Sequence, residues 1–308
     1  MSYARGTAWS VIVLGLAAGC TTGRPAPRLT NTPQATAAMT PVLSPSAEPT
    51  ATQSATPQPS PTATADCLRQ SGRVEEGSYP GVVTREELPF RVYLPPCFPQ
   101  PGTRYPVLFL LHGKPLEAAD WEAMGVVEVA QDGIEAGVWP PFLIVMPLAP
   151  EPMFSWTDGG PGSYEQELSE GLVAFIDQGW PTDARADGRA LAGISRGGVW
   201  ALEIGFRRPD LFDTVIALSP ALIVNAPRPA FDPLLLPVGA SRLPASILLV
   251  AGDRDYARPD TERLVMLLEQ EGKAVRLEIL PGGHIEATWL PGLPLVLEFA
   301  SAAWSSGE

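Results

Sequence analysis

The amino-acid sequence predicts an α/β fold with a mostly parallel central sheet flanked by helices. The first observation is that short apolar segments alternate with amphipathic helical stretches over most of residues 67–304. The second is that most of these segments are apolar at nearly every position, as strands buried on both faces of a parallel sheet are. The 308 residues are 45% hydrophobic, which is enough to form one large core.

The strands and helices follow in chain order from this pattern. Residues 88–94 alternate polar and apolar side chains and are predicted as an antiparallel edge strand. Buried strands are expected at 107–111, 142–146, 190–194, 214–218, 247–251 and 275–279. Helices are expected near 164–178, 197–207, 259–272 and 292–303. Residues 219–246 contain six prolines and little room for a lid, so we expect a minimal lid domain or none, and an open cleft.

Residues 1–19 have the layout of an export signal. One Arg stands near the start, an apolar run covers about 8–18, and small residues precede Cys20. The run is shorter than the roughly 20 apolar residues that a transmembrane helix needs. The sequence AAGC ending at Cys20 resembles a bacterial lipobox, although Leu16 stands one position earlier than in the commonest pattern. We expect a diacylglycerol on Cys20 and a location at the membrane, facing the extracellular or periplasmic side; an ordinary secretory signal is the alternative.

Residues 20–66 are predicted to be a disordered tether. From Thr21 to Asp66, 33 of 46 residues are Thr, Pro, Ala or Ser and none is aromatic, so the segment lacks the apolar surface needed to fold. A coil of this length separates its ends by roughly 40 Å. We interpret it as a spacer without a binding role, and we expect the folded domain to comprise residues 67–308.

The chain has three cysteines, an odd number that needs an explanation if the protein is exported to an oxidising compartment. If Cys20 carries a lipid, Cys67 and Cys97 remain as a pair. A disulfide between them would stabilise the domain by roughly 3 to 4 kcal/mol, and two separately buried thiols are the alternative. Only two histidines are present, His112 and His284, and no Cys has a CxxC partner. We therefore expect no metal site and no cofactor.

The predicted domain is strongly acidic. Residues 67–308 carry 18 basic and 32 acidic side chains, a formal charge of −14. Such a surface repels nucleic acid and anionic lipid headgroups, so no nucleic-acid partner is expected. Contact with a membrane is expected through the lipid anchor only.

Residues 193–197, with the sequence GISRG, match the pattern G-x-S-x-G. The pattern alone is a weak signal, but here it follows an apolar strand and opens a helical stretch, as a nucleophile elbow requires. A sharp turn leaves no room for side chains beside the Ser, which accounts for Gly193 and Gly197. The alternative is a phosphate-binding turn, but no Walker-type Lys follows. The pattern predicts Ser195 as the nucleophile of an acyl transfer.

A serine nucleophile needs a base and a carboxylate. His284 follows the last predicted strand and precedes the last helix, which is where the base of this arrangement is expected. The carboxylate is expected between Ser and His in chain order, at the end of a strand. Asp253 and Asp255 both follow strand 247–251. We choose Asp255, because its position farther along the loop lets it turn back towards His284. Asp253 remains the alternative carboxylate.

The oxyanion hole is expected to use two backbone N–H groups. One is that of Arg196, directly after the nucleophile, and the other belongs to the loop after strand 107–111. Pro115 has no N–H, so Lys114 is the predicted second donor. His112 is interpreted as a structural residue that braces this loop by hydrogen bonds.

The segments that surround these residues resemble a known family over nearly all of residues 86–304. The resemblance is to the putative esterase group of α/β-hydrolases, which includes esterase D, enterochelin esterases, feruloyl and acetylxylan esterases and mycolyltransferases. It is carried by RVYLP at 91–95, LLHG at 110–113 with Trp121, AGISRGG at 192–198, PDLF at 209–212, SPA at 219–221, and GH at 283–284 with Trp289.

The resemblance implies an α/β-hydrolase fold and a triad. The family's Ser, the Asp of its G-x-x-D step and the His of its GGH step correspond here to Ser195, Asp255 and His284. One position departs from the family pattern, because Arg196 stands where an apolar residue usually follows the Ser. This Arg could add positive charge on the acyl or leaving-group side.

We expect an exported serine carboxylesterase that acts on a small-molecule or glycan ester. Candidate walls of the cleft are aromatic: Trp121, Phe154, Trp156, Tyr164 and Trp289. One alternative is an acyltransferase that uses the same triad with a sugar or lipid hydroxyl as acceptor. Another is a non-catalytic surface binding protein that keeps the fold.

Overall fold

The computed structural model describes residues 67, 71–156, 158–225, 227–238, 240 and 242–305, all of which fall in one compact unit, 57–308. The predicted export signal, Cys20 and residues 20–66 of the tether lie outside the described residues. Over the described ranges, no helix combines the length and the apolar character that crossing a membrane requires.

One sheet of eight strands runs through the described residues, in the order β1-β2-β4-β3-β5-β6-β7-β8. The strands are β1 (Arg73–Pro80), β2 (Glu87–Leu94), β3 (Val107–Leu111), β4 (Leu143–Pro147), β5 (Arg189–Ile194), β6 (Thr214–Leu218), β7 (Ser246–Gly252) and β8 (Arg276–Leu280). Strand β2 pairs antiparallel with β1 and β4, and all other neighbours are parallel. The predicted α/β fold with a mostly parallel sheet is confirmed.

The sheet edge differs from the prediction. Residues 88–94 form an antiparallel strand as expected, but β2 is the second strand, because β1 covers its outer side along eight residue pairs. The sequence RVEEGSYP of β1 is mostly polar and partly exposed, so it carries no apolar run. An edge strand needs no such run, since only one side of it is paired and much of it faces solvent.

Helices follow the strands along the chain. The longer ones are α3 (Val126–Glu135), α5 (Val173–Gly179), α6 (Arg196–Arg207), α7 (Arg258–Gln270) and α9 (Leu293–Ser305). The short ones are α2 (Asp120–Ala123), α4 (Tyr164–Gln166) and α8 (Glu286–Trp289). The predicted helix 164–178 consists of α4, a π-helical segment η2 (Glu167–Leu172) and α5. The single 3-10 turns are η1 (Met153–Ser155), η3 (Ala186–Gly188), η4 (Ile223–Asn225) and η5 (Leu290–Gly292).

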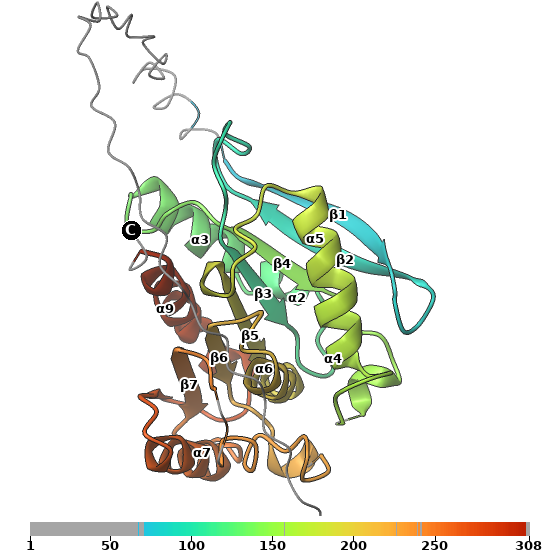
Figure 1. Ribbon diagram of the computed structural model, residues 1–308. Helices are drawn as coiled ribbons and strands as arrows, with labels where there is room; N and C mark the ends of the chain where they lie inside the picture. Colours follow the sequence, from blue (N-terminus) through green and yellow to red (C-terminus); the bar gives the residue numbers. More distant parts are fainter. Residues whose placement is uncertain are drawn as a thin grey trace, which may run out of the picture. The chain divides into compact units, whose positions relative to one another are not determined.

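Both faces of the sheet are covered by helices, as a parallel sheet requires. Successive residues of a strand point to opposite faces. Thus Phe109 packs with residues of α5 and α6, whereas Leu108 and Leu110 pack with residues of α3 and α9. A third cluster joins α6 and α7 to β6 and β7. Figure 1 shows α5 and α6 on one side of the sheet and α3 and α9 on the other.

Two cross-links constrain the first two strands: one joins the two ends of the segment that contains them, and the other binds the turn between them to the helical layer. Cys67 and Cys97 form a disulfide, which confirms the predicted pair. The fully buried carboxylate of Glu167, in η2, accepts hydrogen bonds of 2.7–2.9 Å from the backbone N–H groups of Val82, Val83 and Thr84. Three donors satisfy this buried charge, so the turn between β1 and β2 is fixed to the helical layer.

Candidate active site

Ser195 lies at the tight turn between β5 and α6. Its backbone has φ 54° and ψ −114°, a combination that non-glycine residues rarely adopt. Its N–H donates to the carbonyl of Leu218 at 2.9 Å, which ties the turn to the neighbouring strand β6. Strain held in this way is typical of a functional residue.

The glycines beside Ser195 are required by close backbone contacts. A Cβ atom on Gly193 would lie 2.2 Å from the carbonyl oxygen of Gly197, and a Cβ on Gly197 would lie 2.2 Å from that of Leu111. Gly113 is also close, because its Cβ would lie 3.1 Å from the Cβ of Ser195. The turn and the loop after β3 therefore pass against each other without room for side chains.

Three side chains from separate loops form one line of hydrogen bonds. The Oγ of Ser195 lies 2.8 Å from Nε2 of His284, in the loop between β8 and α8. The Nδ1 of the same ring lies 2.9 Å from Oδ1 and 3.2 Å from Oδ2 of Asp255, which follows β7. The side chain of Asp255 is fully buried and that of His284 is 15% exposed.

The surroundings of Asp255 keep it ionised. Burial acts to raise its pKa, but hydrogen bonds with His284, Ser219 and the N–H of Ala257 outweigh burial, so the pKa lies below its ordinary value. Ser219 also accepts a hydrogen bond of 2.9 Å from Nε1 of Trp289. A carboxylate held in this way fixes the Nδ1–H tautomer of His284 and leaves Nε2 free to accept the proton of Ser195.

Asp253 is turned away from this line. Its Oδ1 accepts a hydrogen bond of 2.8 Å from the N–H of Gly282, and the side chain of Arg254 lies 3.6 Å from it. Its side chain is 46% exposed. Asp253 thus fixes the loop that carries His284, while Asp255 contacts the imidazole itself.

The two predicted oxyanion donors lie on segments next to the nucleophile. The N–H of Arg196 is the first of helix α6, where no intrahelical partner exists. Lys114 follows Gly113, whose backbone passes against Ser195. Among the backbone hydrogen bonds of the described residues, the N–H of Lys114 donates to no carbonyl. The oxyanion role of both amides stays a prediction.

His112 braces the loop, as expected. Its Nε2 accepts a hydrogen bond of 3.1 Å from the N–H of Ala149, so Nδ1 carries the proton and donates to the carbonyl of Gly113 at 2.9 Å. Burial lowers the pKa of His112, which keeps the ring neutral. Among the described residues, no hydrogen bond joins this ring to Ser195.

The side chains of Arg196 and Lys114 bind the segment formed by Glu151 and η1, which we call the η1 wall of the site. Nη2 of Arg196 donates to the carbonyl of Ser155 at 2.8 Å. Lys114 forms an ion pair with Glu151 and a hydrogen bond with Ser155. The charge of Lys114 is thus balanced within the wall, and Arg196 is half-buried there.

Three of the five predicted aromatic wall residues belong to the core instead. Trp121 is 0% exposed and packs in the core between the sheet and α3, and Phe154 and Tyr164 are each 1% exposed. These three predictions are wrong, because an aromatic side chain of this size is as well suited to fill a core as to line a cleft.

The other two aromatic residues lie near the site in different roles. Trp289 is 7% exposed, and its ring meets that of His284 edge-on at 5.2 Å. Trp289 therefore positions Ser219 by a hydrogen bond and His284 by ring contact. Trp156 follows η1 and is 59% exposed, so of the five it is the one open to a ligand.

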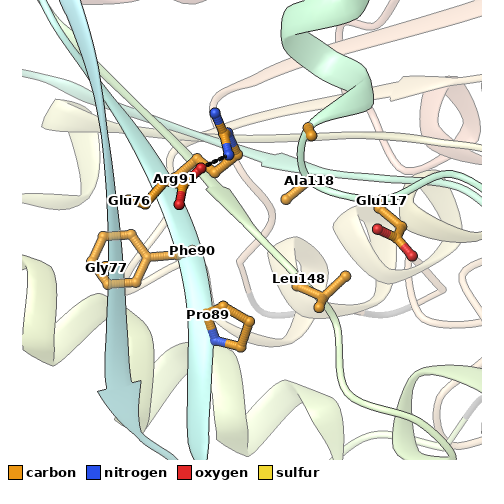
Figure 2. Close-up of a pocket in the computed structure, with 9 residues that line it drawn as sticks. Glu76, Gly77, Pro89, Phe90, Arg91, Glu117, Ala118 and Leu148 are labelled. Carbon is orange, nitrogen blue, oxygen red and sulfur yellow. Dashed lines mark hydrogen bonds and ion pairs between the residues drawn. The ribbon is translucent and has the colours of Figure 1, made fainter.

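A cavity of about 230 Å³ lies apart from this site. Figure 2 shows Phe90, Pro89 and Leu148 along it, with Arg91 paired to Glu76 at its rim. None of the residues that line it belongs to the Ser195, His284 and Asp255 line. Over the described residues, no group of three or more His, Cys, Asp or Glu side chains is arranged to hold a metal ion.

The family profile described as putative esterase matches residues 82–295, which is more than half of the chain. The chain belongs to the putative esterase family. The resemblance seen in the sequence is thereby confirmed, and the chain is a serine hydrolase of carboxylic esters.

Two named relatives lie in the same group. The chain is 28% identical over 224 residues to the ferri-bacillibactin esterase of Bacillus subtilis, covering 62% of this chain and 77% of the relative. It is 34% identical over 113 residues to an endo-1,4-beta-xylanase/feruloyl esterase of Xylanibacter ruminicola, covering 35% of this chain. The second match spans only 16% of that longer protein.

Solved structures of esterases share the fold of this putative esterase. A ferulic acid esterase superposes with a TM-score of 0.68 at 23% identity, covering 76% of this chain and 99% of the other. The enterobactin esterase of Shigella flexneri superposes with a TM-score of 0.62 at 19% identity, covering 76% of this chain and 60% of the other. The predicted α/β-hydrolase fold is confirmed.

Tyr256 and Ser219 were not predicted from the sequence. Ser219 belongs to a segment that carried the family resemblance, but no role was assigned to it. Tyr256 directly follows Asp255, and its hydroxyl lies 3.2 Å from Nε2 of His284. The sequence signal that could have identified Tyr256 is its position directly after the predicted carboxylate, Asp255.

Proposed function

We propose that this esterase is exported and lipid-anchored and that it cleaves its substrate through a Ser195, His284 and Asp255 triad with an acyl-enzyme intermediate. The observation that carries the catalytic part is the unbroken line of hydrogen bonds from Ser195 Oγ through both nitrogens of His284 to Asp255.

The first half-reaction acylates the enzyme. Nε2 of His284 takes the proton of Ser195, and Oγ attacks the ester carbonyl carbon. The negative charge on the carbonyl oxygen is stabilised by the N–H groups of Arg196 and Lys114. The C–O bond to the alcohol then breaks, and the imidazolium gives its proton to the departing oxygen.

The second half-reaction releases the acid. His284 takes a proton from a water molecule, the resulting hydroxide attacks the acyl carbonyl, and Ser195 leaves with the proton returned by Nε2. An acceptor hydroxyl in place of water would give an acyltransferase. A product assay with a sugar acceptor present distinguishes the two, and we expect free acid as the main product.

The substrate class follows from the relatives and the exposed aromatic residue. The related proteins are named for feruloyl esters and for the siderophores bacillibactin and enterobactin. Trp156 offers an exposed aromatic surface on the η1 wall, to which Arg196 and Lys114 are bound. We propose an extracellular ester with an aromatic or sugar group, and a panel of acetyl, feruloyl and acetylated-sugar esters tests this choice.

Labelling of Ser195 tests the nucleophile. We expect a fluorophosphonate probe to label the purified domain 67–308 at Ser195 and to leave Ser195→Ala unlabelled. Ester hydrolysis by that variant should fall by about 10⁴-fold or more, because the acyl-enzyme can no longer form. Ser169→Ala is the matched control, since Ser169 is buried in η2 and donates its hydrogen bond to the carbonyl of Glu165 in the adjoining α4, away from the Ser195, His284 and Asp255 side chains. Hydrolysis retained in Ser195→Ala would overturn the proposal.

Cell fractionation tests the lipid anchor. We expect the full chain to sediment with membranes and to take up labelled palmitate, and Cys20→Ser to do neither. The reason is that the sulfur of Cys20 is the predicted site of acylation, and labelled palmitate separates acylation from membrane retention by an uncleaved export signal. Palmitate taken up equally by Cys20→Ser would contradict the anchor without affecting the triad.

A further inference from the structure

Tyr256 places a phenol hydroxyl at the reacting atoms of the site. Its hydroxyl lies 3.2 Å from Nε2 of His284, the same nitrogen that lies 2.8 Å from Oγ of Ser195. Its ring lies over the imidazole, with centroids 4.4 Å apart and planes 33° apart. The residue is 48% exposed, so a small rotation of the side chain loses little packing.

The hydrogen-bonding capacity of His284 decides what the phenol proton of Tyr256 can bind. With Nδ1–H bound to Asp255, Nε2 of His284 has one lone pair, and Ser195 at 2.8 Å uses it. Burial, and then the charge of Asp255, raise the pKa of Tyr256, so its phenol keeps its proton. The phenol proton therefore finds no free lone pair on Nε2 and stays available to another acceptor beside that atom.

The leaving-group oxygen has to enter the same place. During acylation this oxygen is bonded to the carbon that Oγ attacks and receives the proton from Nε2, so it must lie next to both atoms. The hydroxyl of Tyr256 already lies 3.2 Å from Nε2, the atom that delivers this proton. A substrate can enter only if the hydroxyl moves slightly aside, and the nearest new acceptor for its proton is then the leaving oxygen.

We propose that Tyr256 is a further catalytic residue, whose hydroxyl donates a hydrogen bond to the leaving-group oxygen. In the second half-reaction the same hydroxyl donates to Oγ of Ser195 as that oxygen leaves. No extra proton is transferred, because the proton from Ser195 reaches the alcohol through His284 and the phenol keeps its own. This inference rests on the proposed triad and adds a donor to it.

The dependence on the leaving group tests this role. Tyr256→Phe keeps the ring and removes the donor, and kcat/KM reports acylation. We expect the ratio of wild-type to variant kcat/KM to stay within about 3-fold for p-nitrophenyl acetate, whose leaving oxygen is stable as an anion. For ethyl acetate, whose leaving oxygen carries far more charge, the ratio should reach about 10- to 100-fold, the range expected on losing one hydrogen bond to a charged oxygen.

Two results would overturn the role of Tyr256. One is the same ratio for all leaving groups, which indicates packing on His284 alone; the other is a higher kcat/KM in Tyr256→Phe, which indicates that the hydroxyl only obstructs entry. Labelling of the variant by the fluorophosphonate probe shows that Ser195 and His284 remain active. Ser195→Ala measured on the same esters separates the two proposals, since full turnover there would refute the triad rather than the donor.

Discussion

Replacement of Asp255 by Asn is expected to lower kcat by about 10⁴-fold at neutral pH. The side chain is fully buried and contacts Nδ1 of His284 with both oxygens. The amide of Asn can turn its N–H₂ group towards Nδ1, which then accepts a hydrogen bond. The imidazole proton is in that case on Nε2. That tautomer cannot take the proton of Ser195. Steady-state hydrolysis of p-nitrophenyl acetate measures the loss.

Asp253→Asn is the matched control for this prediction. The two aspartates are two residues apart in the same loop, and the substitution is chemically identical. Asn keeps an oxygen that can accept from the N–H of Gly282, so we expect kcat to change by no more than about 10-fold, corresponding to the loss of the charge on one hydrogen bond. A larger loss in Asp253→Asn than in Asp255→Asn would reverse the assignment of the triad carboxylate.

Most strands of the sheet could be predicted because they are buried on both faces. Val107–Leu111 and Thr214–Leu218 match their predicted ranges, and their residues are buried throughout. Strand β1 and helix α3 were missed. The residues of β1 are largely polar because it forms the edge, and α3 keeps only three residues of ten buried, Val126, Ala130 and Ile134. Strand β1 leaves a weak pattern because its stability comes from pairing, whereas the apolar residues of α3 recur at helical spacing and were overlooked.

The site residues were predictable to the extent that local geometry fixes them. The turn around Ser195 needs glycines at fixed positions, and this requirement is visible in the sequence. The choice between Asp253 and Asp255 depends on the path of a loop, since the N–H of Asp253 is bound to the carbonyl of Leu280 and its carboxylate to Gly282. Both candidates are aspartates, so residue type alone does not predict which of them the loop brings to His284.

Burial limited the prediction of the cleft in the same way. Trp121 and Trp156 have the same side chain, yet one is 0% and the other 59% exposed. Which of them faces solvent is decided by the layers that pack around α2 and η1. The sequence therefore indicates the reacting groups better than the surface that selects the ester.

Glu203→Gln is expected to stabilise the domain by a few kcal/mol at pH 8. Glu203 lies in α6 and is 0% exposed. Burial, and secondly the charge of Glu165, raise its pKa from the ordinary 4.5 to about 9, although the nearby backbone of Gly159 and the charge of Arg207 oppose the shift. The charge of Asp158 adds to the shift. At neutral pH the folded protein thus holds a proton on this carboxyl that the unfolded chain has released.

The sign of the pH dependence follows from this difference in bound protons. Below pH 4.5 both states hold the proton, and Glu203 adds no pH dependence. As the pH rises from 4.5 towards 9, only the folded state holds it, so each pH unit lowers the free energy of unfolding by about 1.4 kcal/mol. Glutamine resembles the protonated carboxyl and does not titrate, so the variant lacks this loss.

Urea unfolding at several pH values measures the difference between wild type and Glu203→Gln. We expect it to be small at pH 4 and to grow steadily up to pH 8. Glu269→Gln, an exposed site on α7, is the control and should show no such growth. A difference that stays constant with pH would mean that Glu203 is ionised in the folded protein. In that case the carboxylates of Glu203 and Glu165 would share the positive charge of Arg207, whose Nε already binds Glu165 at 2.7 Å.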